Sequence, residues 1–270
     1  MKTFGSSRWL TRAGLAAVLM LVAGLAAFAA ACGGDDGEEG EIRDTADAIV
    51  KAYNDKDVDA FLSYWTDSGI QEGFDATRQE AQEFLAEGLG DPPMSIRSIS
   101  NIKVSGDTAT ADVELAFGLS LEPERDSFVK EGGVWKIDGA EDVSPEIPSD
   151  VTAIDLKLVD FAFDFDASAI KSGDIAFRVE NVGEQPHQVI LSKIPEDLDL
   201  EAALQSEETP PGVEDIAVLE FVDVGAKANM VFTESLEPGR YVLLCFFPDT
   251  EDPEGTPHVF KGMQAEFHVQ

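Results

Sequence analysis

The chain has 270 residues and a large excess of acid, with 19 Lys and Arg against 53 Asp and Glu and a formal net charge of −34. A negative field of this size repels nucleic acid and anionic lipid headgroups, so we expect no nucleic-acid partner. The same charge attracts cations and basic partners, and it favours solubility.

The N-terminus has the pattern of a signal peptide. Lys2, Arg8 and Arg12 precede an apolar run over residues 13–31 that contains no charge. A basic head, an apolar middle and small residues before the cleavage point are typical of secretory signal peptides. A transmembrane helix left in place is the alternative, because the run is just long enough to span a bilayer. Both interpretations place residues 33–270 outside the cytoplasm.

The apolar run ends in small residues that lead directly into a cysteine, with the sequence AAACGG over residues 29–34. This ending resembles a bacterial lipobox, although Ala29 stands where Leu is usual. The resemblance implies that residues 1–31 are removed and that acylated Cys32 anchors the protein to the outer face of a bacterial membrane. Since lipid then occupies Cys32, Cys245 is the one remaining cysteine and an intrachain disulfide is impossible.

An acidic, Gly-rich stretch over residues 33–47 has almost nothing to bury. We therefore expect a solvated tether, assigned to residues 32–41, that lifts the folded part off the lipid.

Apolar residues next recur at helical spacing in three segments, which predicts three helices over residues 42–53, 58–65 and 81–89. Asp57 is placed to cap the second helix, and Pro92-Pro93 prevents the third from continuing. Strands follow. Apolar and polar residues alternate over 111–117, and Gly132-Gly133 predicts a hairpin between 127–131 and 134–138.

Three helices followed by a curved antiparallel sheet resemble the NTF2-like fold, a cone with one pocket, over residues 42–140. Enzymes of that superfamily place Asp, His or Tyr in the cone, but this stretch contains no His, and alternation puts Asp112 and Glu114 on the polar face. Three aromatic residues are expected to fill core: Tyr53, Tyr64 and Trp65. We therefore expect a binding or spacing module without enzymatic activity, whose ligand stays open.

An acidic segment with two prolines, AEDVSPEIPSD over residues 140–150, predicts an exposed linker, assigned to residues 141–150. From residue 151 the pattern is all-β, and short strands separated by turn signals indicate a Greek-key sandwich over residues 151–270. Alternation over 154–158 continues at the same period through Phe161 to Phe165. Further strands are expected at residues 175–179, 187–191, 230–232, 241–246 and 265–269, with one or two helical turns at 198–204.

Four residues in the last 120 positions carry metal-binding side chains in a specific order. His187 begins a strand, and Cys245, His258 and Met263 follow near the C-terminus. This order resembles the cupredoxins, the type 1 blue copper proteins. The resemblance covers residues 151–270 and implies one copper ion bound by His187, Cys245, His258 and Met263.

The donor chemistry suits copper independently of that resemblance. Two imidazoles and a thiolate suit both oxidation states, and a weak axial thioether tunes the potential. The third histidine, His268, falls on the opposite face of its strand, together with Glu266. Twelve residues separate Cys245 from His258, an acidic and Pro-rich excursion that leaves room for an unusual donor such as Asp249 or Glu251.

The leading hypothesis is a lipid-anchored, extracytoplasmic carrier that transfers single electrons through one copper ion to an extracytoplasmic redox partner. The resemblance to the cupredoxins implies that electrons leave through the edge of the His258 ring, with Val259 and Phe260 as its apolar surround. Two alternatives stay open. One is a metal-free binding module on the same fold, and the other is a protein for copper delivery or storage.

Overall fold

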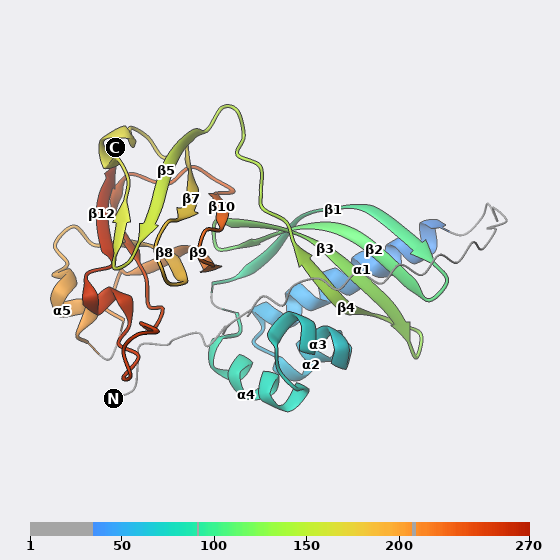
Figure 1. The fold of residues 1–270 in the computed structure, drawn as a ribbon. Helices are drawn as coiled ribbons and strands as arrows, with labels where there is room; N and C mark the ends of the chain where they lie inside the picture. The colour runs from blue at the N-terminus through green and yellow to red at the C-terminus, as the bar shows by residue number, and fades with distance from the viewer. Residues whose placement is uncertain (1–34, 91, 207–208) are drawn as a thin grey trace.

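The computed structural model describes residues 35–90, 92–206 and 209–270 (Figure 1). Within these residues the chain forms three four-stranded sheets, ordered β1-β2-β3-β4, β10-β7-β5-β6 and β12-β11-β8-β9. Helices pack against the first sheet, and the other two sheets face each other across one core. None of the helices in the described part of the chain has the length and apolarity needed to cross a membrane.

In the described part of the chain, four helices precede the first sheet: α1 (Asp35–Asn54), α2 (Val58–Ser63), α3 (Asp67–Phe74) and α4 (Arg78–Gly88). Side chains mark their starts. Asp57 caps α2 by accepting from the Ala60 amide, Thr66 caps α3, and Thr77 forms a capping box with Glu80 on α4. The apolar faces of the helices and sheet share one core, in which Ile42, Tyr53, Trp65, Leu85, Val113 and Trp135 are buried.

Strands β1 (Met94–Ser105), β2 (Thr108–Phe117), β3 (Ser120–Glu131) and β4 (Val134–Asp142) form an antiparallel meander. The predicted hairpin is confirmed, because Glu131 pairs with Val134 across Gly132-Gly133. Both glycines have positive φ, the backbone that tight hairpin turns require.

Two expectations for this region are wrong. Residues 35–47 belong to α1, so they do not form an extended tether, and residues 32–34 lie outside the described part. Ile42 on this helix is fully buried, so the helix packs against the core from its third turn onward. There are also four helices instead of three, because α3 separates the second and third predicted helices.

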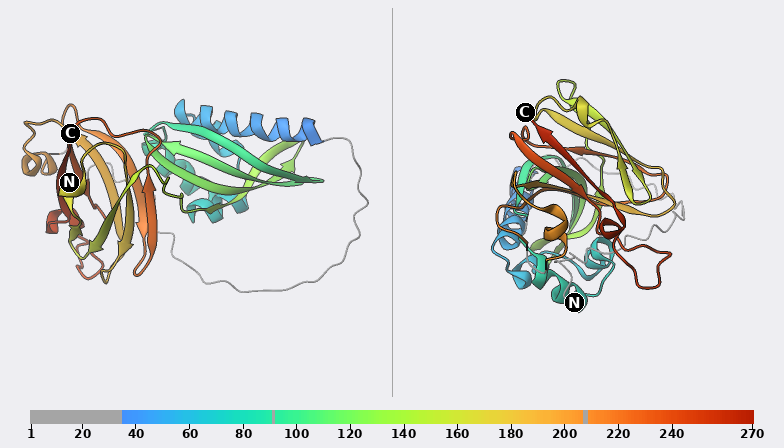
Figure 2. Two further views of the ribbon diagram at one scale, coloured as in Figure 1. Left: turned by 90° about the horizontal axis from the view of Figure 1, so that it is seen from above. Right: turned by 90° about the vertical axis from the view of Figure 1, so that its left-hand side faces the viewer.

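The remaining strands form the two facing sheets of the sandwich (Figures 1 and 2). Their bounds are β5 (Thr152–Val159), β6 (Ala162–Asp164), β7 (Ile175–Asn181), β8 (His187–Ile194), β9 (Glu214–Val222), β10 (Lys227–Val231), β11 (Gly239–Leu244) and β12 (Gln264–Val269). Pairing is antiparallel except between β5 and β7, which run parallel. The short helix α5 (Leu200–Leu204) packs with Val242 and Leu244 on the outer face of the β12-β11-β8-β9 sheet.

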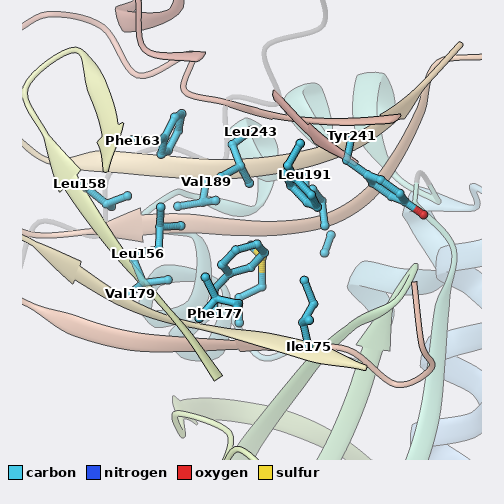
Figure 3. Packing of buried hydrophobic residues seen from close by; sticks show 14 of the residues in the cluster. Leu156, Leu158, Phe163, Ile175, Phe177, Val179, Val189, Leu191, Tyr241 and Leu243 are labelled. Atoms are coloured by element: carbon cyan, nitrogen blue, oxygen red, sulfur yellow. The ribbon is translucent and has the colours of Figure 1, made fainter. Parts of the chain in front are cut away.

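Figure 3 shows how the inward side chains of the two sheets meet in one core. Leu156, Leu158, Phe177 and Val179 come from one sheet, and they face Val189, Leu191 and Leu243 from the other. The same cluster includes Cys245 and Met263, both fully buried, so two of the predicted copper ligands belong to the continuous core.

Alternation was misleading at one place in this region. Residues 154–165 do not form one strand, because the chain turns at Asp160-Phe161 and β6 returns antiparallel to β5. Phe161 makes this turn with a left-handed backbone, φ 65°. Strand β9 has no counterpart among the predicted strands, although the others and the helical turns at α5 are confirmed.

The segment predicted as a linker is more ordered than expected. Strand β4 continues to Asp142, so regular structure ends two residues inside the range 141–150. Pro145 is buried, and its carbonyl accepts a hydrogen bond from the Asn229 side chain at 2.9 Å.

Candidate metal centre

Three of the four predicted ligands come together at one end of the sandwich. His187 is the first residue of β8, Cys245 follows the last residue of β11, and His258 opens the 3-10 helix η2 (His258–Lys261). Each of the three side chains is buried, and each residue is 0% exposed. The sandwich thus supplies one donor from a strand and two from the connection between its last two strands.

The donor atoms converge at metal-binding separations. The two imidazole Nδ1 atoms of His187 and His258 lie 3.1 Å apart, and the Cys245 Sγ lies 3.6 Å from Nδ1 of His258. One donor atom from each residue lies within 4.8 Å of the others. Metal bonds of about 2.0 Å to nitrogen and 2.3 Å to sulfur would separate such donors by about 3 to 4 Å. The three residues therefore fit a single metal ion.

Backbone hydrogen bonds hold the two donors from the last connection in place. The Val259 amide donates to the Cys245 carbonyl at 2.7 Å, and the Met263 amide donates to the His258 carbonyl at 3.0 Å. The Gln188 amide points at the Cys245 Sγ at 3.4 Å. An amide aimed at sulfur stabilises a thiolate, so this contact favours the ligating form of the cysteine.

The segment before His187 is ordered by one buried amide. Asn181 donates from Nδ2 to the carbonyls of Gln185 and Val222 and accepts from the Gly183 amide. These bonds fix the bend that brings His187 to the start of β8. On the other side of the ring, Nε2 of His187 lies 3.0 Å from Oδ1 of Asp160.

Burial shifts the ionisation of all three donors toward their neutral forms. Desolvation lowers the pKa of His258 to about 4, and the adjacent His187 adds to this effect. Burial also lowers the pKa of His187, although its bond to Asp160 opposes the change. For Cys245, burial raises the thiol pKa to about 11.

The fourth predicted ligand, Met263, is fully buried in the core beside the site. Its carbonyl accepts from the Cys245 amide at 3.3 Å, so its backbone is tied to both Cys245 and His258. Its assignment as an axial ligand rests on chain order and this proximity along the backbone.

The two unusual donors considered for the long connection are placed elsewhere. Asp249 is buried and pairs with Lys261, which lowers its pKa to about 2. Its Oδ1 accepts from the Glu251 amide, and the Glu251 side chain is exposed. Half of residues 248–257 are exposed, and the connection closes on itself by the pairing of Pro248 with Pro257. His268 is a surface residue near Glu196, also as expected.

The expected surface edge of His258 is wrong. This residue and Val259 are buried, and of the expected apolar surround only Phe260 is exposed. Phe161 covers the ring instead, with an edge-to-face contact at 5.1 Å between centroids. The residues that sequence reasoning missed are therefore Asp160, Phe161 and Gln188. No motif marks them, since they touch the donors only after the chain has folded.

In the helix–sheet region, Asp112 and Glu114 lie on the polar face as predicted. Asp112 pairs with Arg125 at 2.7 Å, and Glu114 accepts from Ser98. A different carboxyl was missed. Asp126 on β3 is buried, and its pKa is raised well above the usual value by desolvation and by the neighbouring Glu124. The predicted lipid site, Cys32, lies outside the described residues.

No family model matches the chain, and neither does any curated protein. Solved structures similar to parts of it include a cupredoxin and NTF2-like proteins. Reduced auracyanin from the photosynthetic bacterium Roseiflexus castenholzii is 23% identical, covers 44% of this chain and 97% of its own, and has a TM-score of 0.30. An NTF2-like protein of unknown function from Shewanella oneidensis is 15% identical, covering 39% of this chain and 98% of its own, with a TM-score of 0.33. Another from Pseudomonas putida is 18% identical, covering 44% and 93%, with a TM-score of 0.32. At these identities and scores the likenesses carry no information about function.

Proposed function

We propose that this protein is a type 1 copper protein that transfers single electrons through one ion bound by His187, Cys245, His258 and Met263. The observation that carries the proposal is the convergence of two imidazole Nδ1 atoms and one thiol sulfur in a buried site. A soft thiolate with two imidazoles and a weak axial thioether is the donor set of electron-transfer copper.

Bound copper would take up and pass on one electron by alternating between its doubly and singly charged states. The chain's part is to keep the donors fixed. The Met263 backbone is hydrogen-bonded to both Cys245 and His258, and His187 starts a central strand of the sandwich. Because these donors belong to a packed core, little has to move when the charge of the ion changes.

Burial favours electron transfer over copper delivery or storage. All three donor residues are 0% exposed, so an incoming chelator has no free ligand atom to attack. A delivery site needs a ligand that an acceptor protein can reach. An electron can instead pass through the side chains that cover the site.

The proposal includes the location and the organisation of the chain. Residues 1–31 act as a signal peptide, and lipid on Cys32 anchors the protein outside the cytoplasm, where its redox partner also resides. Residues 42–140 form an NTF2-like binding or spacing module without catalytic activity, and residues 151–270 form a cupredoxin-like domain.

Visible absorption with one equivalent of copper(II) tests the copper site. We expect a thiolate-to-copper charge-transfer band that disappears in Cys245→Ser, because a hydroxyl is a poor soft donor. His187→Ala or His258→Ala should weaken copper(II) binding by at least about 100-fold. The control is His268→Gln, which removes the exposed third histidine and should leave the band unchanged.

Two results would contradict the proposal. Stoichiometric copper without a sulfur band, unaffected by Cys245→Ser, would mean adventitious binding by the acidic surface. No specific copper binding at all would favour the metal-free binding module.

A further inference from the structure

The turn between β5 and β6 touches both histidines of the site. It consists of Asp160 and Phe161, far in the sequence from His187 and His258. Asp160 reaches the outer nitrogen of His187, and Phe161 lies edge-to-face on His258. Two adjacent residues thus contact the two imidazole rings of the site.

Backbone amides and the His187 ring hold the carboxylate of Asp160 in one position. It accepts hydrogen bonds from the Glu184 amide at 2.9 Å and from the Gln185 amide at 3.3 Å, and Oδ1 lies 3.0 Å from Nε2 of His187. Gly183 makes the approach feasible, since a Cβ there would lie 2.3 Å from Oδ1 of Asp160 and 2.9 Å from Nε2 of His187. Any larger residue would push the carboxylate and the imidazole apart.

A carboxylate at this atom determines which nitrogen of His187 carries hydrogen. Nε2 donates to Asp160, so Nδ1 keeps its lone pair and faces Nδ1 of His258 and the thiol. The contact also places a negative charge one ring away from the metal position. Such a charge stabilises a doubly charged ion more than a singly charged one.

Phe161 adopts a backbone conformation that its side chain disfavours. Its φ of 65° is left-handed, which is a genuine outlier for a bulky residue. Strain of this kind persists only where surrounding contacts fix it. Here the ring is held between the imidazole of His258 and the ammonium of Lys261, which lies 5.3 Å from the ring centroid.

We propose that the Asp160-Phe161 turn is the positioning element of the site, with Asp160 orienting His187 and Phe161 closing His258 off from solvent. The proposal rests on the copper function for its effect on the reduction potential. Its geometric part concerns the metal-free protein and can be tested separately.

Asp160 is tested by nitrogen-15 NMR of the imidazoles in the metal-free full chain. His187 should be in the Nε2–H form in wild type and in Asp160→Asn, whose amide oxygen still accepts. In Asp160→Ala it should become a mixture of tautomers. An unchanged tautomer in Asp160→Ala would overturn the orienting role, whether or not the protein binds copper.

The charge of Asp160 is tested on the copper-loaded protein. Asp160→Asn should weaken copper(II) binding about tenfold relative to copper(I), which raises the one-electron potential by about 59 mV. Asp164→Asn is the matched control, because it removes the same charge from β6, where Asp164 pairs with Lys157 away from the turn. If both variants raise the potential equally, the effect comes from net charge alone. That result would overturn the role of Asp160 at His187.

Phe161 is tested by acylation of the metal-free protein with diethyl pyrocarbonate, followed by mass spectrometry. In wild type, exposed His268 should react and His258 should resist. Phe161→Gly, which suits the left-handed backbone, should let His258 react at least several-fold faster. Phe260→Gly removes a more exposed aromatic ring nearby and should not. If His258 stays protected in Phe161→Gly, the closing role is wrong.

Discussion

At the scale of single residues, burial determines which of the three donors must lose a proton before it can bind a metal. Both imidazoles have a lowered pKa, so at neutral pH they are uncharged and offer a lone pair. The thiol of Cys245, with a pKa raised to about 11, is protonated. Binding therefore releases one proton, from sulfur, and the Gln188 amide at 3.4 Å helps to stabilise the thiolate that remains.

The buried carboxyl of Asp126 gives a prediction about stability. Its Oδ1 has no hydrogen-bond partner among the described residues, and its pKa is raised because burial and Glu124 disfavour the charge. In the unfolded chain the Asp126 carboxyl loses its proton near pH 4. Above that pH the folded protein still holds this proton and the unfolded chain does not. The contribution of Asp126 to the free energy of unfolding is fully present below pH 4. It is lost as the pH rises toward the raised pKa of the folded state. Asp126→Asn should therefore be more stable than wild type at pH 7 but not at pH 4.

Urea unfolding followed by tryptophan fluorescence measures this effect, because Trp65 and Trp135 lie in the same core as Asp126. Asp112→Asn is the control with the opposite sign. The bond to Arg125 lowers the pKa of Asp112, so its contribution is present above pH 4 and is lost below it. An Asp126→Asn variant with the same pH profile as wild type would contradict the prediction.

At the scale of elements, strong periodicity was sufficient to predict most of the fold. The helical repeats over α1, α2 and α4 and the alternation over β2, β5 and β7 follow directly from which side chains are buried. The order of His187, Cys245, His258 and Met263 likewise indicated the candidate site, because donor chemistry is visible in the sequence.

Two strands of the structure, β1 and β9, were not predicted, and the same cause explains both. Strand β1 shifts register between Ile96 and Ser98 and again between Ser100 and Lys103, which breaks its alternation. Strand β9 is paired with β8 through two similar shifts. A bulge moves apolar residues out of phase, so the period of two disappears from the sequence although the strand forms.

The β5–β6 turn was hidden for the opposite reason. Phe161, Phe163 and Phe165 repeat the period of two found in β5, although one residue out of phase with Leu158, and no Gly, Asn or Pro marks the reversal. The turn depends on a strained backbone at Phe161 that tertiary contacts maintain. Such a conformation opposes local preference, and sequence patterns report only local preference.

The long connection between Cys245 and His258 gives a prediction about an element. Lys261 pairs with Asp249 and lies 3.4 Å from Asp252, so one ammonium closes the excursion over residues 248–257. The hydrogen bond to Lys261 lowers the pKa of Asp249 to about 2, so the pair is intact at neutral pH and is lost only as the pH falls toward 2. Lys261→Gln should let the excursion open more often.

A glutamate-specific protease measures that opening, because Glu251 and Glu254 are exposed in the excursion. Cleavage there should be several-fold faster in Lys261→Gln than in wild type at neutral pH. Lys171→Gln, which removes an exposed lysine from another loop, should cleave at the wild-type rate. Equal rates in all three proteins would mean that the Pro248–Pro257 pairing alone holds the excursion.

At the scale of the whole molecule, two cores are joined at the β2–β3 turn (Figure 2). The Leu119 amide donates to the Ile216 carbonyl, its carbonyl accepts from the Thr233 amide, and both distances are 2.9 Å. Its side chain packs against the sandwich core, and Ser120 pairs with Phe232. This residue of the β2–β3 turn thus packs into the core of the other two sheets, so we expect it to stabilise the sandwich.

Leu119→Ala should therefore destabilise the sandwich although it lies outside residues 151–270. Leu119 is half-buried, so we expect a loss of about 1–2 kcal/mol, less than for a full core position. In a Cys32→Ser background, thiol reactivity of buried Cys245 in urea reports the sandwich, and tryptophan fluorescence reports the other core. The first midpoint should fall more than the second. Val134→Ala, at a residue 46% exposed in the neighbouring hairpin, should move neither. An unchanged Cys245 midpoint in Leu119→Ala would mean that the turn only rests against the sandwich.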